Sequence, residues 1–113
     1  MSFTFQRLDV YRCSIDFLAL CVPLLDGHPR GQATLADQLR RAAISIPLNI
    51  AEAEGRTGSA DKARTYAIAR GSAMECAAIL DVQNTLGSIE ELTYRRGTEL
   101  LGRVVAMLTK LCR

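Results

Sequence analysis

Apolar residues recur at intervals of three and four positions along most of the chain, and no segment alternates apolar and polar residues as a half-buried strand does. This spacing places apolar side chains on one face of an α-helix. The first segment follows a heptad pattern through Leu8, Tyr11, Ile15, Leu18, Val22 and Leu25. We therefore predict an all-α fold whose first helix packs through this seam and kinks or loosens at Pro23, which cannot donate a helical hydrogen bond.

Loop and capping residues delimit a second helix. Residues 26–31, which read Asp-Gly-His-Pro-Arg-Gly, have the composition of a loop. Thr34, with Asp37 three residues later, resembles the capping pattern at a helix N-terminus. The helix is predicted to run from there to about Glu54, where residues 55–58 end it.

Two further helices follow. Ser59 is predicted to cap a third helix that ends at Leu86, where Gly87 takes the left-handed conformation. Ser88 and Glu91 form a capping box for a fourth helix. Its predicted core residues are Leu92, Leu100, Leu101, Val104, Leu108 and Leu111.

Chain length limits how these helices can be arranged. Residues 1–113 suffice for one domain with its own core but not for two. Hydrophobic residues make up 49% of the chain and aromatic residues only 5%, so the core is mainly aliphatic. Four helices with short links predict an antiparallel, up-down four-helix bundle.

The sequence offers no pattern typical of a metal or cofactor site. The four cysteines, Cys13, Cys21, Cys76 and Cys112, lack a Cys-x-x-Cys pair and share the chain with a single histidine. This spacing matches no zinc site and suits reduced thiols in a cytoplasmic protein. Residues 1–7 do not resemble a signal peptide, and the longest apolar run, residues 17–25, is too short to span a bilayer. We expect no cofactor, no metal and no membrane partner.

The polar residues also argue against catalysis. His28 lies in a Gly/Pro loop without an evident nucleophilic partner, and Ser72 is predicted to lie mid-helix, where it lacks the strained elbow of a nucleophilic serine. Glu52 and Glu75 are single carboxylates on different helices and suit pairing with arginines better than acid–base work. The chain is therefore predicted not to be an enzyme.

The second helix carries one apolar face more than a bundle helix needs. Its predicted core face comprises Leu35, Leu39, Ala42, Ile46, Ile50 and Ala53. Roughly opposite lie Ile44, Leu48 and Ala51, with Pro47 alongside. A polar stripe of Arg41, Ser45, Asn49, Glu52 and Arg56 runs between the two faces. Since one apolar face suffices for the core of the subunit, the second face predicts a partner.

Pro47 has two interpretations at this point. It can simply bend the helix around the bundle, or its bend can present Ile44 and Leu48 to another subunit. The polar stripe can likewise make ion pairs between subunits or face a ligand. The predicted oligomer interface comprises Arg41, Ile44, Ser45, Pro47, Leu48, Asn49, Ala51 and Glu52.

Basic residues suggest a second kind of surface. The net charge is only +2, so bulk charge does not indicate a nucleic-acid-binding protein. A local excess of positive charge nevertheless begins at Arg56 and continues into the third helix. The candidate nucleic-acid-binding residues are Arg40, Arg41, Arg56, Lys62, Arg64, Arg70, Arg95 and Arg96. They predict RNA or DNA as a possible partner.

Several segments together resemble a known family. Residues 38–47 read Gln-Leu-Arg-Arg-Ala-Ala-Ile-Ser-Ile-Pro, followed by Asn-Ile-Ala-Glu at 49–52 and Gly-Arg at 55–56. They resemble the signature of a bacterial four-helix bundle family first noted as proteins encoded in intervening sequences of 23S rRNA genes. Residues 69–75, Ala-Arg-Gly-Ser-Ala-Met-Glu, and the opening Leu-Asp-Val-Tyr at 8–11 are similar to the family as well.

The resemblance implies a homopentamer whose biochemical role is poorly defined. It extends to a relative, the accessory variability protein of diversity-generating retroelements, a basic pentamer that binds nucleic acid and a reverse transcriptase. Leu48 and Ala53 depart from the Ser and Gly usual in the family, and both changes are compatible with a tighter interface. The low net charge weakens the transfer of nucleic-acid binding, which depends on neutralising phosphates.

Two functions remain open. One is a non-enzymatic homo-oligomeric scaffold, pentameric by resemblance, for nucleic acid or an enzyme that acts on it. The alternative is a protein–protein adaptor whose inter-subunit grooves hold a helix or peptide of a partner, without nucleic acid.

Overall fold

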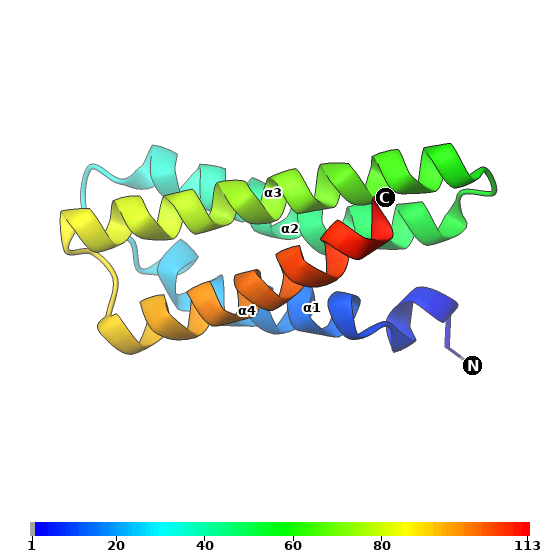
Figure 1. The fold of residues 1–113 in the computed structure, drawn as a ribbon. Coiled ribbons are helices and arrows are strands. Elements are labelled where there is room, and N and C mark those ends of the chain that lie inside the picture. Colours follow the sequence, from blue (N-terminus) through cyan, green and yellow to red (C-terminus); the bar gives the residue numbers. More distant parts are fainter. Residues whose placement is uncertain (1) are drawn as a thin grey trace.

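The computed structural model describes residues 2–113, which form four long helices preceded by a short one (Figure 1). In chain order they are η1 (Thr4–Arg7), α1 (Asp9–Asp26), α2 (Ala33–Gly55), α3 (Ser59–Leu86) and α4 (Glu91–Leu111). Each long helix packs against the one that follows it, and α4 returns to pack beside α1. The predicted all-α, up-down four-helix bundle is confirmed.

The predicted caps of α2 and α3 are wrong by one or two residues. Gln32 precedes α2 and Gly58 precedes α3, so Thr34 and Ser59 lie inside the helices and no described side chain caps either end. Before α2, the amide of Gln32 donates to the carbonyl of Pro29 in a turn at 3.1 Å, and the Gln32 carbonyl already accepts the first helical bond. α2 therefore follows directly on a backbone turn, and the N-cap residue Gln32 makes no side-chain capping hydrogen bond.

The Ser88–Glu91 capping box is also wrong, and the reason lies at the end of α3. Gly87 adopts the predicted left-handed conformation, with φ of +72°. The Ser88 amide then donates to the carbonyl of Gln83 at 2.9 Å, the bond that closes a Schellman motif. Because this bond ties Ser88 to α3, α4 begins later, with Glu90 as its N-cap residue.

The predicted packing seam of α1 differs from the observed one. The buried residues are Val10, Cys13, Ser14, Phe17, Cys21 and Leu25. Ile15 and Val22, which the heptad pattern placed in the core, are exposed. Polar atoms on the observed face are satisfied locally, since the Ser14 hydroxyl donates to the Tyr11 carbonyl at 2.7 Å. α1 therefore turns a face of small and aromatic residues, rather than its regular aliphatic seam, toward α2 and α4.

α4 packs tightly against α3 and α1 at the buried Gly97, a residue that the sequence did not single out. A Cβ at this position would lie 2.7 Å from Leu80 Cδ1 and 3.2 Å from Leu20 Cδ2. Such distances are shorter than van der Waals contact, so a larger residue at position 97 would require the ends of the Leu80 and Leu20 side chains to shift. Gly71 on α3 is exposed instead, and a Cβ there would meet none of the described atoms within 4 Å.

Three of the four cysteines lie in the core as small hydrophobic residues. Burial raises the pKa of the Cys21 thiol to about 12, and burial together with the nearby Cys21 raises the pKa of Cys76 above its ordinary value of 9.0. Both thiols are therefore neutral in the folded protein at a pH where they ionise in the unfolded chain.

This difference predicts a loss of stability in alkali. Because the folded pKa values are raised, the stabilisation is complete below pH 9 and is lost as the pH rises toward 12. The free energy of unfolding, measured by urea denaturation, should fall by about 1.4 kcal/mol per pH unit for each thiol concerned. The variant Cys21→Ala/Cys76→Ala should show a shallower fall, and an equal slope in both proteins would contradict the prediction.

Candidate interaction surface

The core face of α2 matches the prediction closely. Leu39, Ala42, Ile46, Ile50 and Ala53 are buried, and Leu35 is half-buried at the edge of the core. Ile44 and Leu48 lie on the outer face, where 63% of Leu48 is exposed. The second apolar face therefore exists on the folded subunit.

Pro47 requires a correction, because it is buried within the subunit. It precedes Leu48 and follows Ile46, on the flank of α2 between its core and outer faces. That flank packs within the chain, so the Pro47 ring is not available to a second subunit. The remaining outer residues are Ile44, Leu48 and the half-buried Ala51.

Part of the predicted polar stripe joins α2 to α3. The hydroxyls of Ser45 and Ser72 lie 2.9 Å apart. Asn49 Nδ2 donates to the Ser45 carbonyl at 2.8 Å and to the Ser45 hydroxyl at 2.9 Å. Since Ser45 Oγ accepts from Asn49, it is free to donate to Ser72. Ser45 and Asn49 thus stabilise the packing of helices within one subunit.

This contact brings together the two sequence signatures, residues 38–56 and residues 69–75. The sequence predicts no partner for Ser72. The two serines are 27 positions apart, so nothing in the local pattern indicated their pairing. Beside them lies a surface depression of about 350 Å³, lined by Gln38, Arg41, Ala42, Ser45, Ser72 and Glu75.

Arg41 and Glu75 give the depression an unusual charge distribution. Both side chains are exposed, and within residues 2–113 neither forms an ion pair or a side-chain hydrogen bond. One positive and one negative group therefore line the same depression without neutralising each other. Such groups are available to complementary charges on another molecule.

α3 continues the apolar outer surface of α2. α2 and α3 run in opposite directions and meet at the contact between Ser45 and Ser72. One helical turn from this contact leads to Asn49 on α2 and to Ile68 on α3, in the same direction along the bundle. Ile68 therefore lies alongside Asn49, and half of its surface is exposed. Gly71 lies on the same side of α3, between Ile68 and Glu75. We name this surface the α2–α3 face and define it by Arg41, Ile44, Leu48, Glu52, Ile68, Gly71 and Glu75.

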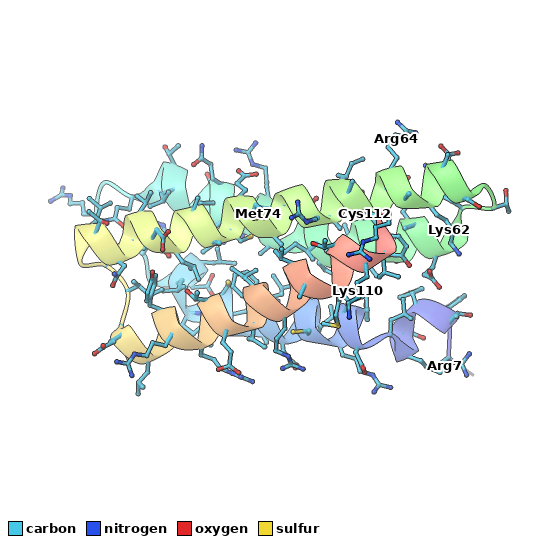
Figure 2. All side chains as sticks on the ribbon, in the orientation of Figure 1. Arg7, Lys62, Arg64, Met74, Lys110 and Cys112 are labelled. Atoms are coloured by element: carbon cyan, nitrogen blue, oxygen red, sulfur yellow. The ribbon has the colours of Figure 1, made fainter. Side chains whose placement is uncertain are left out.

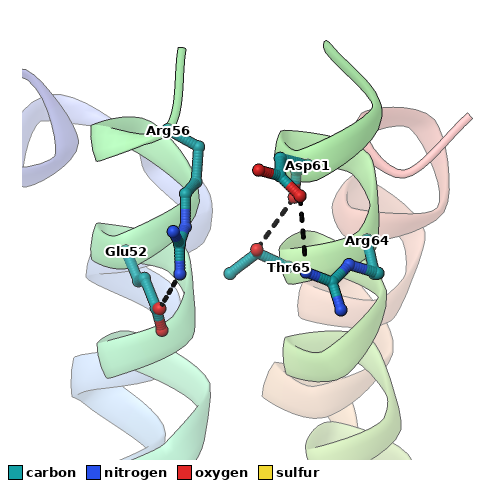
Figure 3. Close-up of polar contacts among 5 residues, drawn as sticks. All are labelled: Glu52, Arg56, Asp61, Arg64 and Thr65. Atoms are coloured by element: carbon teal, nitrogen blue, oxygen red, sulfur yellow. Dashed lines mark hydrogen bonds and ion pairs between the residues drawn. The ribbon is translucent and has the colours of Figure 1, made fainter. Parts of the chain in front are cut away.

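Most of the candidate nucleic-acid-binding residues have acidic partners. Arg56 pairs with Glu52 at 2.5 Å and Arg64 with Asp61 at 3.3 Å (Figure 3). The other pairs are Arg40–Asp37, Lys62–Glu54, Arg95–Glu91 and Arg96–Glu99. Arg70 Nε donates to the Thr109 hydroxyl at 2.8 Å. Within residues 2–113, Arg41 is the one candidate of the eight that forms neither an ion pair nor a side-chain hydrogen bond.

These basic residues do not form one patch. Lys62 and Arg64 lie near the α2–α3 turn (Figure 2). Arg95 and Arg96 belong to the first turns of α4, at the opposite end of a bundle 45 Å long (Figure 1). A single nucleic-acid contact on one subunit would therefore engage only some of them.

The α2–α3 turn is held by a contact that the sequence did not reveal. The Tyr66 hydroxyl donates to Glu54, which also pairs with Lys62 at 3.8 Å. Burial, assisted by this hydrogen bond, raises the pKa of Tyr66 above its usual range. Glu54 and Tyr66 lie on different helices, so periodicity within one helix could not indicate their contact.

Two other properties concern possible partners. Within residues 2–113, no group of three or more His, Cys, Asp or Glu side chains is placed so that it could hold a metal ion. None of the helices in that range is sufficiently long and apolar to cross a bilayer.

Comparison with known proteins agrees with the resemblance noted in residues 38–56 and 69–75. No curated protein matches the chain. The fold is similar to the crystal structure, at 1.70 Å resolution, of a protein of unknown function from the S23 ribosomal protein family of Bacteroides thetaiotaomicron. The TM-score is 0.84 at 24% identity, over 92% of this chain and 98% of the other. The sequence pattern of the 23S rRNA-intervening sequence proteins matches residues 6–110. This chain therefore belongs to the 23S rRNA-intervening sequence protein family.

Proposed function

We propose that this protein is a non-enzymatic homo-oligomeric scaffold whose subunits associate through the α2–α3 face. The observation that supports it is the exposure of Leu48 next to Ile44 and Ile68, on a face that also carries Arg41 and Glu75, neither of which has an ion-pair partner within residues 2–113. Apolar groups flanked by complementary charges are the usual composition of an interface between subunits.

The family resemblance makes a pentamer the expected stoichiometry. A ring of five has heterologous contacts, in which one surface of a subunit meets a different surface of the next. Ile15 and Val22 are exposed one above the other on the outer side of α1 and supply a second apolar surface. We propose that the α2–α3 face of one subunit packs against this side of α1 in its neighbour.

The particle mass in solution tests this proposal. Light scattering coupled to size exclusion, with native mass spectrometry, should give a particle of five chains of 12.4 kDa each. The mass should stay constant over a wide range of protein concentration, since a closed ring leaves no free interface. A 12.4 kDa species at all concentrations would exclude the scaffold.

A protein–protein adaptor is the second candidate, and the depression beside Ser45 and Ser72 favours it. Arg41 and Glu75 line it without an ion-pair partner among the described residues, and both can bind a polar segment of a partner. This candidate requires no nucleic acid and agrees with the acidic pairing of six of the eight basic residues. Binding of nucleic acid, and the relation to retroelement accessory proteins, stay predictions.

Copurified nucleic acid would distinguish a scaffold that binds nucleic acid from an adaptor that binds none. The chain has three tyrosines and no tryptophan, so it absorbs weakly at 280 nm and even little nucleic acid raises the 260/280 ratio. If RNA or DNA binds, its affinity should fall steeply with added salt, because phosphate contacts release counterions. Affinity that does not change with salt would exclude a phosphate-driven mode.

A further inference from the structure

α3 carries a row of exposed residues that the core of the subunit does not use. They recur every three or four positions, so they lie on one face of the helix. We name this row the α3 seam; it comprises Ile68, Gly71, Glu75, Ala78, Val82 and Leu86. Glycine weakens the interior of a helix, yet a Cβ at Gly71 would meet no other part of residues 2–113 within 4 Å. Nothing in the subunit therefore requires glycine at this position.

α1 has a similar row on its outer side. We name it the α1 seam; it comprises Arg12, Ile15, Ala19 and Val22, all of which are exposed. Each seam includes a single charged residue, Arg12 on α1 and Glu75 on α3. Neither of these two has an ion-pair partner within residues 2–113, and Arg12 Nε donates only to the Gln6 carbonyl, at 3.4 Å. The two seams thus have opposite charges.

The seams match in sequence when Arg12 is placed opposite Glu75 and the two helices run in parallel. Ile15 then lies opposite Ala78, and Val82 lies opposite Ala19, so a large residue meets a small one in each layer. The match continues because each of these α3 residues follows its α1 counterpart by 63 positions.

An antiparallel arrangement with the same ion pair fits less well. It would place Ile15 opposite Ser72, which already bonds to Ser45, and Val22 opposite the buried Thr65. The seams therefore favour parallel packing.

α1 and α3 have the matching level within one subunit. Both run in the same direction along the bundle (Figure 1). A Cβ at Gly97 would lie 2.7 Å from Leu80 of α3, and 3.2 Å from Leu20 and 3.5 Å from Phe17 of α1. Leu80, which follows Phe17 by 63 positions and Leu20 by 60, is thus level with this part of α1.

This level is the one that a ring requires. Rotation about an axis parallel to the bundle moves no residue along that axis, so α1 of one subunit meets α3 of the next at an unchanged level. Arg12 and Glu75, which are also 63 positions apart, therefore come opposite each other without a shift of one subunit along the other.

We propose that the α1 seam of one subunit packs in parallel against the α3 seam of the next, with Arg12 paired to Glu75 across the contact. This inference rests on the ring of the proposed function and identifies the ion pair that sets its register. A shifted register would leave both charges unpaired against apolar residues, which is unfavourable.

Exchange of the two charges tests the pair. Arg12→Glu and Glu75→Arg should each raise the protein concentration at half-dissociation about tenfold or more, because like charges then meet inside the contact. The double variant Arg12→Glu/Glu75→Arg should restore association, as measured by light scattering. Arg103→Glu is the matched control, since Arg103 is exposed on α4 outside both seams and should leave the mass unchanged.

Disulfide cross-linking tests the register directly. In a Cys112→Ser background, Ile15→Cys/Ala78→Cys should form disulfides between chains under mild oxidation, because opposing residues of packed helices come within disulfide reach. Ile15→Cys/Gly71→Cys should not, since position 71 is displaced by seven residues, about 10 Å along the helix. Within residues 2–113, α1 and α3 do not pack against each other, so a cross-link between them joins two subunits.

The outcomes separate this inference from the proposed function. A parent protein that is monomeric at all concentrations would overturn both. An oligomeric parent would leave the scaffold standing, while three results would overturn the inference alone. These are an unchanged mass in Arg12→Glu and Glu75→Arg, no restoration in the double variant, and equal cross-linking of the two cysteine pairs.

Discussion

Leu48→Asp is expected to convert the assembled protein into folded monomers. Leu48 is 63% exposed on the subunit, so an aspartate there is solvated and the bundle remains intact. In the proposed interface the same carboxylate would be buried against apolar groups without a partner. Burial of an unpaired charge costs several kcal/mol, and about 3 kcal/mol per interface already weakens association more than a hundredfold.

Leu92→Asp is the matched control for this experiment. Leu92 and Leu111 were wrongly predicted to lie in the core, since both are exposed on α4. Leu92 is the most exposed large apolar residue described, at 76%, and lies outside the α2–α3 face. Both variants should retain the helical circular dichroism spectrum, and only Leu48→Asp should lose mass by light scattering. An oligomer of unchanged mass in Leu48→Asp would place the interface elsewhere.

Phe17→Ala is expected to have the largest effect on the stability of the subunit. The Phe17 side chain is fully buried in the core. Truncating a buried phenylalanine removes its transfer free energy and leaves a cavity, which together cost about 3–5 kcal/mol. This is a large share of the free energy of unfolding of a small domain. Urea denaturation in the Leu48→Asp background measures it without a contribution from subunit dissociation.

Ile15→Ala is the informative comparison on the same helix. The regular heptad pattern placed Ile15 in the core, whereas the structure leaves it 37% exposed. In the monomeric background this change should cost less than about 1 kcal/mol, because the side chain buries only part of its surface. If Ile15→Ala cost as much as Phe17→Ala, α1 would be packed through the predicted seam after all.

The number, order and approximate ends of the helices could be predicted because they depend on neighbouring residues. Gly87 ends α3 in the expected conformation, and residues 55–58 separate α2 from α3 as predicted. The predicted hydroxyl caps were wrong because α2 and α3 begin before the expected hydroxyl can cap them, with Gln32 and Gly58 as N-cap residues, and because Ser88 is held by the end of α3. A capping pattern shows that a hydroxyl can cap a helix, but whether it does so depends on the path of the chain before it.

The face that each helix turns inward was predicted less well. The core face of α2 was right, since its apolar residues form a continuous set from Leu39 to Ala53. On α1 two overlapping sets compete, one with Ile15 and one with Phe17. The burial of Phe17 depends on the space between α2 and α4, which includes the close approach at Gly97. Periodicity along one helix contains no information about that space.

Patterns along the chain were enough to predict the four-helix bundle and the boundaries between its helices, because helical periodicity and helix-breaking residues act locally. They were also enough to indicate the family, because its signature is a linear run of residues. The packed helices were needed to reveal that Ser45 pairs with Ser72, that Pro47 is buried, and that Arg41 and Glu75 line one depression without an ion-pair partner within residues 2–113. These properties depend on the rotation and register of one helix against another, and packing across the whole core sets both.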